Sequence, residues 1–160
     1  MAGFAIRFYP ERCVGCQACV VACMNEKDID PGKGEQPLCR IWEQERDVSE
    51  TGSMKSQKSL LTWKRQVCRH CDHPSCIDIC PGSGFWKDEA TGMVLYDKTR
   101  CVSCGQCIDT CEEHAISFDR NRVIQKCDGC RDRILNGQQP SCVSVCPWGA
   151  LELTKSHEVC

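Results

Sequence analysis

The chain has 160 residues, 18 of them cysteine, and a formal net charge of −2 at neutral pH. This cysteine content is typical of a scaffold built on cysteine chemistry, whereas Leu, Ile, Val and Phe together fall just below the roughly 20% that an apolar core requires. The mildly acidic balance excludes a basic nucleic-acid-binding surface, and no run of 18 apolar residues is present that would span a bilayer.

The N-terminal segment contains a predicted strand and a first group of cysteines. Residues 3–9 are expected to form a short strand that ends at Pro10. The first group then follows with the spacing C-x2-C-x2-C-x3-C, which is typical of iron–sulfur clusters. A helix is predicted over 18–25, inside this motif. Residues 1–12 lack the apolar stretch of a signal peptide. The cysteines of the first group are Cys13, Cys16, Cys19 and Cys23.

An insertion separates the first group from the second. Residues 31–60 are rich in Gly, Pro, Ser and charged side chains. We predict a loop that is partly ordered around 38–42 and has a mobile tip near 49–59. The second group has the spacing x2, x4, x3 and is followed by Pro81; its members are Cys68, Cys71, Cys76 and Cys80.

The second half of the chain repeats this plan. Segments 85–87 and 93–96 predict a β-hairpin. Short strands are expected at 115–118, 123–125 and 150–153. The third group has the spacing of the first and the fourth has x2, x11, x3; they are Cys101, Cys104, Cys107 and Cys111, then Cys127, Cys130, Cys142 and Cys146.

Two phrases recur and indicate an internal duplication. The sequence RCVGC at 12–16 returns as RCVSC at 100–104. The sequence PSCIDICP at 74–81 returns as PSCVSVCP at 140–147. Groups one and three are therefore of one kind and groups two and four of the other, so the chain is a duplicated two-cluster unit.

Sixteen grouped cysteines provide the ligands of four clusters, and in two-cluster ferredoxins the fourth cysteine of each run binds the other cluster. Two pairings remain open: groups one with two and three with four, or two with three and one with four. Only 20 residues separate Cys80 from Cys101, against 44 between Cys23 and Cys68. The linker lengths favour an inner module of groups two and three, closed over by groups one and four.

The four groups, the x11 spacing and the phrase KCDGC at 126–130 resemble the four-cluster ferredoxin-type subunits of molybdenum and tungsten oxidoreductases. These include iron–sulfur subunits of dimethyl sulfoxide reductase-like enzymes, formate dehydrogenases, hydrogenlyases and tungsten aldehyde oxidoreductases. The resemblance covers nearly the whole chain. It implies an α+β fold of two nested bacterial-ferredoxin-like modules, with short strands and helices around four 4Fe–4S clusters. We expect the outer module at 1–30 plus 117–160 and the inner module at 61–116.

The resemblance also implies which cysteines share a cluster. The outer sets are Cys13, Cys16, Cys19 with Cys146, and Cys127, Cys130, Cys142 with Cys23. The inner sets are Cys68, Cys71, Cys76 with Cys111, and Cys101, Cys104, Cys107 with Cys80. Glu112 stands where many relatives have proline, and its charge is expected to lower the reduction potential of the adjacent cluster.

Other residue patterns have a plain structural explanation. Structural zinc uses paired C-x2-C knuckles. Groups one and three instead have three cysteines in succession, each two residues apart, which favours iron–sulfur binding. Cys39 is expected to be a buried free thiol, and Cys160 an exposed tail residue. His70 and His73 are expected in solvated loops, while His114 helps to turn the chain. Lys126, Arg131 and Arg133 surround group four and either offset the cluster charge or raise its potential, or they form a solvated basic face. The four tryptophans are expected to plug the core or shield clusters; they are Trp42, Trp63, Trp86 and Trp148.

The chain offers no nucleophile–base pair, phosphate-binding glycine loop or open metal site, so no active site of its own is expected. The leading hypothesis is a subunit that relays single electrons between a molybdenum- or tungsten-cofactor catalytic subunit and a second redox subunit, which carries flavin or another acceptor or donor. A tungsten aldehyde oxidoreductase is the favoured partner, and dimethyl sulfoxide reductase-like or formate dehydrogenase/hydrogenlyase complexes are alternatives. A free soluble polyferredoxin and a self-associating redox wiring protein also remain open. The expected location is cytoplasmic, or periplasmic by export with a signal-bearing partner.

Overall fold

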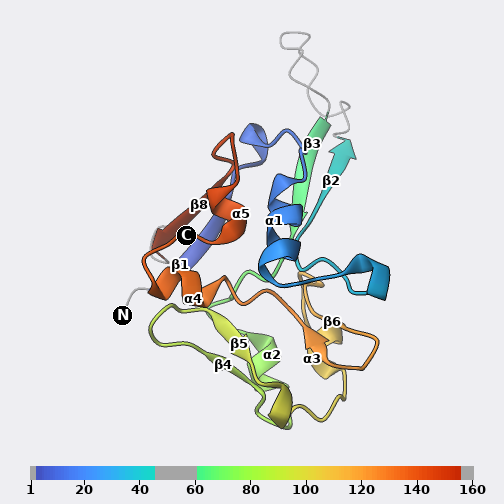
Figure 1. Ribbon diagram of the computed structural model, residues 1–160. Coiled ribbons are helices and arrows are strands. Elements are labelled where there is room, and N and C mark those ends of the chain that lie inside the picture. The colour runs from blue at the N-terminus through green and yellow to red at the C-terminus, as the bar shows by residue number, and fades with distance from the viewer. Residues whose placement is uncertain (1–2, 46–60, 156–160) are drawn as a thin grey trace, which may run out of the picture.

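The computed structural model describes residues 3–45 and 61–155, in which short helices and strands surround the cysteine loops (Figure 1). The longest helix is α1 (Ala18–Glu26). The remaining helices are α2 (Ser75–Asp78), α3 (Gln106–Asp109), α4 (Arg131–Leu135) and α5 (Ser141–Ser144), with single 3-10 turns at Pro10–Arg12, Pro31–Lys33 and Lys98–Arg100. The strands are β1 (Phe4–Phe8), β2 (Arg40–Glu45), β3 (Leu61–Gln66), β4 (Phe85–Lys87), β5 (Val94–Tyr96), β6 (Ser117–Phe118), β7 (Ile124–Gln125) and β8 (Leu151–Lys155). The fold is therefore α+β, as expected from the sequence.

Among the described residues, the strands pair only in antiparallel twos. Pairs β2–β3, β4–β5 and β6–β7 join neighbours in the chain, whereas β1 pairs with β8 from the opposite end. In that ribbon Phe4 lies opposite Lys155 and Phe8 opposite Leu151. The N-terminal strand is thereby fixed beside the segment that follows the fourth cysteine group.

The helices also contact each other in two distant pairs. Helix α1 packs against α5, and α2 packs against α3. Figure 1 shows the first pair in the upper part of the molecule with β1 and β8, and the second pair below with β4 and β5. Since α1 carries group one and α5 carries group four, segments more than a hundred residues apart lie together.

The hydrophobic core is divided into three small clusters, and each contains cysteine. The largest is built on Phe85, Val94, Cys107, Ile116 and Ile124. The other two contain Cys23, Cys39, Val67 and Cys127, and Cys142, Val143 and Leu151. Cysteine thiols thus occupy core positions that aliphatic side chains fill in most domains, as the low aliphatic content predicts.

The turn between β4 and β5 bonds to β1 and α4, and so connects the lower half of the molecule in Figure 1 to the upper half. Thr91 is fully buried, and its carbonyl accepts a 2.7 Å hydrogen bond from the Phe4 N–H of β1. Asp88 accepts bonds from the Thr91 amide and hydroxyl and pairs with Arg131 of α4 at 3.1 Å. A Cβ built on Gly3 would stand 2.9 Å from the Gly92 Cα, so the two backbones touch.

Most predicted elements are confirmed. The predicted helix is α1, the strands at 3–9, 115–118, 123–125 and 150–153 are β1, β6, β7 and β8, and the hairpin is β4–β5. The sequence did not predict the β2–β3 hairpin, which places 40–45 beside 61–66. The mobile tip predicted near 49–59 lies outside the described residues. No helix in the described ranges is long and apolar enough to cross a membrane.

Candidate iron–sulfur cluster sites

The four cysteine loops share one backbone feature. In each, the second residue after the first cysteine has a left-handed conformation: Gly15 (φ 69°), His70 (53°), Ser103 (54°) and Gly129 (71°). The N–H groups of Ser103 and Gly129 donate to the Sγ atoms of Cys101 and Cys127, each at 3.3 Å. Hydrogen bonds to the sulfur ligands are one of the means by which proteins tune iron–sulfur clusters. The duplication seen in the sequence therefore extends to local geometry.

The segments after the fourth cysteines of groups two, three and four also share a turn, whereas helix α1 continues past Cys23. The third residue beyond each of these cysteines has a positive φ and donates its N–H to the carbonyl of that cysteine. These residues are Ser83, His114 and Gly149. After Cys80 and Cys146, the next N–H donates to the thiol sulfur at 3.3 Å, from Gly84 and Ala150 respectively. The predicted role of His114 in turning the chain is confirmed.

Two of the loop glycines lie against large side chains. A Cβ on Gly15 would stand 2.2 Å from the indole of Trp63, and one on Gly129 would stand 2.4 Å from Met93 Sδ. Met93 is fully buried, so it has little room to move. The left-handed backbone and the close neighbour together require glycine at both positions.

Gly129→Ala is expected to lower both cluster content and stability. The left-handed backbone and the clash with Met93 together cost at least about 2 kcal/mol, which corresponds to a fall of at least about 4 °C in the apparent Tm. Iron content per chain and thermal denaturation of the holoprotein measure the effect. Gly137→Ala is the matched control, since Gly137 has the same φ of 71° but nothing within 4 Å of the position that an added Cβ would take. An equal loss in both variants would contradict the packing argument.

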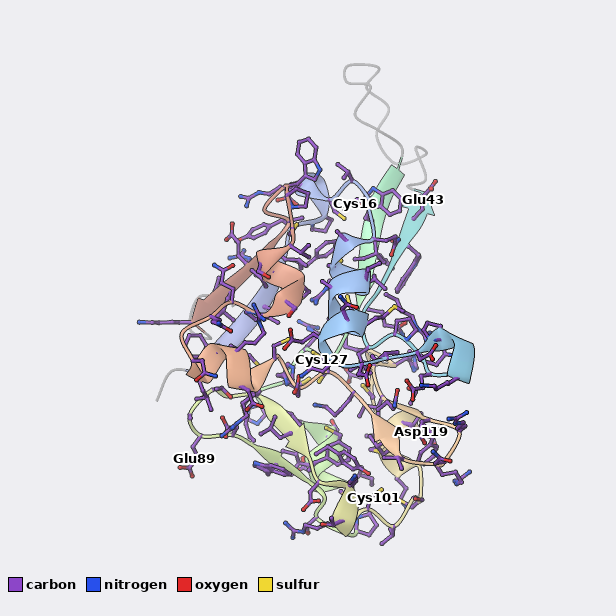
Figure 2. The ribbon with its side chains drawn as sticks, in the orientation of Figure 1. Cys16, Glu43, Glu89, Cys101, Asp119 and Cys127 are labelled. Atoms are coloured by element: carbon purple, nitrogen blue, oxygen red, sulfur yellow. The ribbon has the colours of Figure 1, made fainter. Side chains whose placement is uncertain are left out.

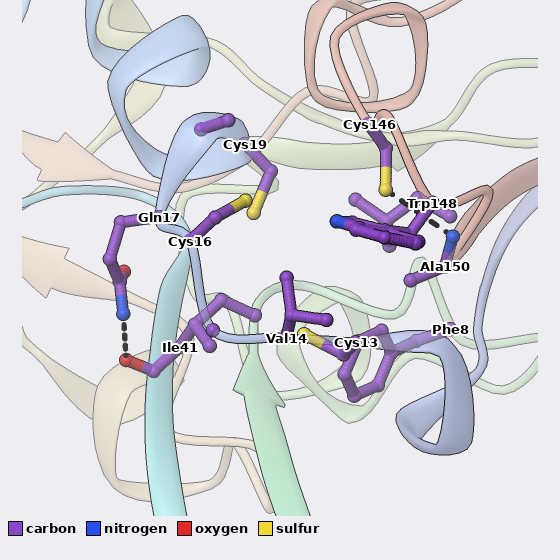
Figure 3. A pocket seen from close by; sticks show the side chains of 13 residues that line it. Phe8, Cys13, Val14, Cys16, Gln17, Cys19, Ile41, Cys146, Trp148 and Ala150 are labelled. Carbon is purple, nitrogen blue, oxygen red and sulfur yellow. Dashed lines mark hydrogen bonds between the residues drawn. The ribbon is translucent and has the colours of Figure 1, made fainter.

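One group of four thiols faces a common space near the paired chain ends (Figure 3). Cys13, Cys16 and Cys19 reach it from the loop before α1, and Cys146 reaches it from the turn after α5. Apolar side chains enclose the space: Phe8, Val14, Ile41, Trp148, Ala150 and Leu151. The arrangement keeps four sulfur atoms around one site with few competing polar groups.

A second group lies at the centre of the molecule, and all four of its cysteines are buried: Cys23, Cys127, Cys130 and Cys142. Burial, followed by the nearby Cys39, Cys142 and Cys130 thiols, raises the pKa of Cys23 to about 12. Burial likewise raises the pKa of Cys142 to about 11. These thiols therefore keep their protons when no metal is bound, and iron binding must release them.

The remaining thiols form two groups in the lower half. Burial and the neighbouring Cys68, Cys111 and Cys71 raise the pKa of Cys76 to about 11. Burial and Cys104, with Cys80 and Cys101 next, raise that of Cys107 to about 11. The fourth cysteine of each run is thus close to thiols of a different run.

These sites suit clusters of several metal atoms. Nowhere in 3–45 or 61–155 do three His, Cys, Asp or Glu side chains converge as ligands of a single ion would. Four thiols line one shared space, and main-chain N–H groups donate to the sulfur atoms of Cys80, Cys101, Cys127 and Cys146. The described cysteines are free of disulfides. Such donor sets fit 4Fe–4S clusters.

The other predicted side chains have mixed outcomes. Cys39 is a buried free thiol, as predicted, and His73 is exposed. The solvated environment predicted for His70 is wrong, because His70 is only 8% exposed.

Trp148 borders the four-thiol space and shields it, but Trp42 and Trp86 are exposed and plug no core. Cys160 lies outside the described residues. Among the basic residues, Arg131 and Arg133 form ion pairs with Asp88 and Glu26, and Lys126 is buried.

One residue at the central site was missed. Arg65 Nη2 donates to Cys142 Sγ at 3.6 Å, and its buried Nε has no partner among the described residues. The sequence held no signal for it, because its position depends on the unpredicted pairing of β3 with β2.

Glu112→Gln is expected to raise the reduction potential of the cluster that Cys111 ligates. The side chain is exposed and adjacent to that cysteine, so loss of its negative charge favours the extra electron. Screened surface charges contribute about 0.2–1 kcal/mol, which is at most about 40 mV for one electron. An EPR-monitored redox titration measures the shift, with the remote exposed Glu89→Gln as control. Unchanged potentials in Glu112→Gln would refute the electrostatic role.

The four loops and their thiols define a ferredoxin-type iron–sulfur protein, and the sequence comparisons agree. Residues 60–156 match the 4Fe-4S dicluster domain, and residues 10–24 match a 4Fe-4S binding domain. The chain therefore belongs to the 4Fe–4S dicluster family and binds 4Fe–4S clusters; its sixteen grouped cysteines supply the ligands of four.

Within that family, the chain belongs with the electron-transfer iron–sulfur subunits of oxidoreductases. It is 35% identical to the thiosulfate reductase electron transfer subunit PhsB of Salmonella typhi, over 92% of this chain and 73% of the relative. It is 32% identical to the B subunit of the anaerobic dimethyl sulfoxide reductase of Haemophilus influenzae, over 99% and 77% respectively. The nitrate-inducible formate dehydrogenase iron–sulfur subunit of Escherichia coli K12 is 33% identical over 92% of this chain, which spans 52% of that longer relative.

Proposed function

We propose that this chain relays single electrons between a catalytic subunit with a molybdenum or tungsten cofactor and a second redox partner. The observation that carries the proposal is a series of thiol groups extending through the molecule. Figure 2 shows Cys16 near one end, Cys127 at the centre and Cys101 near the other end. The clusters supply one-electron redox chemistry when bound, and the chain fixes their order and surroundings.

The proposed ligand sets are those implied by the family resemblance. The outer sets are Cys13, Cys16, Cys19 with Cys146, and Cys23 with Cys127, Cys130, Cys142; the inner sets are Cys68, Cys71, Cys76 with Cys111, and Cys80 with Cys101, Cys104, Cys107. The shared space in Figure 3 supports the first set. The mutual influence of the thiols on their pKa values supports the other three.

Contacts between sets support a linear order. The Cys19 thiol of the first set lies near Cys142 of the buried set, and Cys127 of the buried set lies near Cys68 of the third. The third and fourth sets meet where α2 packs on α3. Both terminal sets contain an exposed cysteine, Cys16 and Cys104, so both ends of the series approach the surface; the third set approaches it too, at the exposed Cys71.

We further propose that the two halves are nested modules. The pairing of β1 with β8 and the packing of α1 on α5 support an outer module of 1–30 and 117–160. The α2–α3 contact and the β4–β5 hairpin support an inner module within 61–116. One strand of the inner range, β3, pairs with β2 of the 31–60 insertion.

Both ends carry exposed apolar side chains that suit contact with partner proteins. Val14 is 50% and Trp148 is 62% exposed beside the first set. Val102 is 63% and Ile79 is 43% exposed beside the last. Apolar side chains at a surface next to a redox centre favour close approach of a partner and exclude water there.

The relatives of this chain suggest which class of enzyme its catalytic partner belongs to. The relatives named above belong to thiosulfate reductase, dimethyl sulfoxide reductase and formate dehydrogenase, and a catalytic subunit of that kind is the partner we propose. A tungsten aldehyde oxidoreductase, the partner favoured by the sequence alone, is the alternative. Self-association and a free polyferredoxin are the competing forms of the protein itself.

Affinity purification of the tagged chain under anaerobic conditions tests the proposal. We expect a complex that contains a large second subunit with bound molybdenum or tungsten, measured by elemental analysis. The metal found distinguishes the two partner classes. A chain that purifies at native levels as a lone 18.0 kDa species, or only as oligomers of itself, would refute the subunit assignment.

A further inference from the structure

Lys126 is a buried cation at the centre of the molecule. It is 9% exposed and directly precedes Cys127, which lies in the middle of the molecule in Figure 2. Its ammonium group donates to the Cys127 carbonyl at 2.6 Å and also to the Val94 carbonyl of β5. Both acceptors belong to the main chain, and Val94 is itself buried. The charge is therefore held in one place.

No carboxylate pairs with this charge within the described part of the chain, although Asp128 and Asp132 line the same cavity as Lys126. Lys126 forms no ion pair there, whereas Lys27 pairs with Asp128 at 2.7 Å and Arg131 pairs with Asp88. A buried cation without a counter-charge costs several kcal/mol. The adjacent cluster sites supply negative charge when they are occupied, because a 4Fe–4S cluster held by four thiolates is an anion.

Lys126 lies beside two different thiol groups. Its neighbour Cys127 is in the core cluster against which Cys68 packs, and Val94, whose carbonyl accepts from the Lys126 ammonium group, is in the core cluster against which Cys76 packs. Cys127 belongs to the buried outer set and Cys76 to the first inner set. Lys126 is thus located where the second cluster of the relay meets the third.

His70 completes this junction from the inner side. Its Nδ1 accepts a 2.9 Å hydrogen bond from the Val94 N–H, so the remaining hydrogen of the neutral ring is on Nε2. That Nε2 is buried and has no partner among residues 3–45 and 61–155. The backbone of Val94 therefore bonds to both side chains: its N–H donates to the His70 imidazole, and its carbonyl accepts from the Lys126 ammonium group. Both side chains provide donors in a buried region rich in sulfur.

The internal duplication shows whether the loop needs a lysine at this position in order to fold. The residue that corresponds to Lys126 in the second group is Val67, since VCRHC at 67–71 is equivalent to KCDGC at 126–130. Both loops have a residue with left-handed backbone conformation at the same position, His70 in one and Gly129 in the other. A lysine is therefore not required to form the loop, and its presence in one copy calls for another explanation.

We propose that Lys126 is a positioning residue for electron transfer, which raises the reduction potentials of the two middle clusters together and so favours entry of the electron into the middle of the relay. This rests on the proposed relay and its ligand sets. The extra electron adds negative charge to whichever middle cluster holds it, and the fixed ammonium group stabilises that charge at both. One electron leaves one cluster and enters the next, and no proton needs to move.

Redox titration of the isolated holoprotein, monitored by EPR, tests the proposal. In Lys126→Met we expect two of the four couples to fall together, each by about tenfold in its reduction equilibrium constant, or about 59 mV. Lys126→Arg should keep both within a third of that shift. The exposed Lys98→Met, three residues before Cys101, is the surface-charge control and should leave all four couples unchanged.

A third variant keeps the test decisive if Lys126→Met loses clusters. Lys126→Gln retains donors for the two carbonyls but removes the charge, and the same paired fall is expected. Unchanged couples in fully loaded Gln or Met protein, an equal shift of all four couples, or cluster loss in Arg as well as Gln would overturn the proposal. Because the titration needs no partner protein, its failure is distinct from failure to purify a complex.

Discussion

Complete removal of iron is expected to abolish the cooperative thermal transition of this protein. The three core clusters are small, each contains at least one cysteine, and Met93, Val94 and Thr91 are among the few side chains that are fully buried. A chain with so few aliphatic residues gains too little from apolar burial to offset its conformational entropy. As in small zinc-binding domains, metal binding must supply much of the folding free energy.

The measurement compares near-UV circular dichroism and thermal denaturation before and after chelation with an oxidant under anaerobic conditions. The holoprotein should melt cooperatively, whereas the apoprotein should show neither fixed aromatic signals nor a transition. The same buffer and chelator without the oxidant, with iron content confirmed unchanged, is the control. A cooperative melt of the fully iron-free chain would show that the core is sufficient without its clusters.

The sequence predicted the cysteine framework well because the ligand spacing is local. The turn at His114 was predicted because it depends on a few neighbouring residues, whereas the four left-handed loop residues were not predicted. The strands β1 and β8 were also predictable, since each flanks a motif. Their pairing across almost the entire chain was suggested only by the nested arrangement of the groups.

The failures have a common cause in distant contacts. His70 was predicted to be solvated, yet the β4–β5 hairpin covers it and Val94 donates to its ring. Arg65 reaches Cys142 because β3 pairs with β2 across the insertion. Lys126 in a polar phrase gave no sign that two main-chain carbonyls would hold it in the interior. In each case the position is set by a partner remote in sequence.

Cys111→Ser is expected to destroy the cluster that we propose Cys68, Cys71 and Cys76 ligate, rather than the one beside it in sequence. The Cys111 thiol influences that of Cys76, and α2 packs on α3 at this point. Serine is a poor substitute for a thiolate ligand of iron, so about a quarter of the bound iron should be lost. Iron analysis gives the total, and alkylation with mass spectrometry identifies the released thiols.

The reciprocal variant supplies the control for that experiment. In Cys111→Ser, reactive thiols should appear at 68, 71 and 76 while 101, 104 and 107 stay protected. In Cys80→Ser the pattern should reverse, since Cys80 lies near Cys107. Alkylation of 101, 104 and 107 in Cys111→Ser would mean that each run keeps its own fourth cysteine. The ligand sets, the nested modules and the position of Lys126 between two clusters would then all have to be revised.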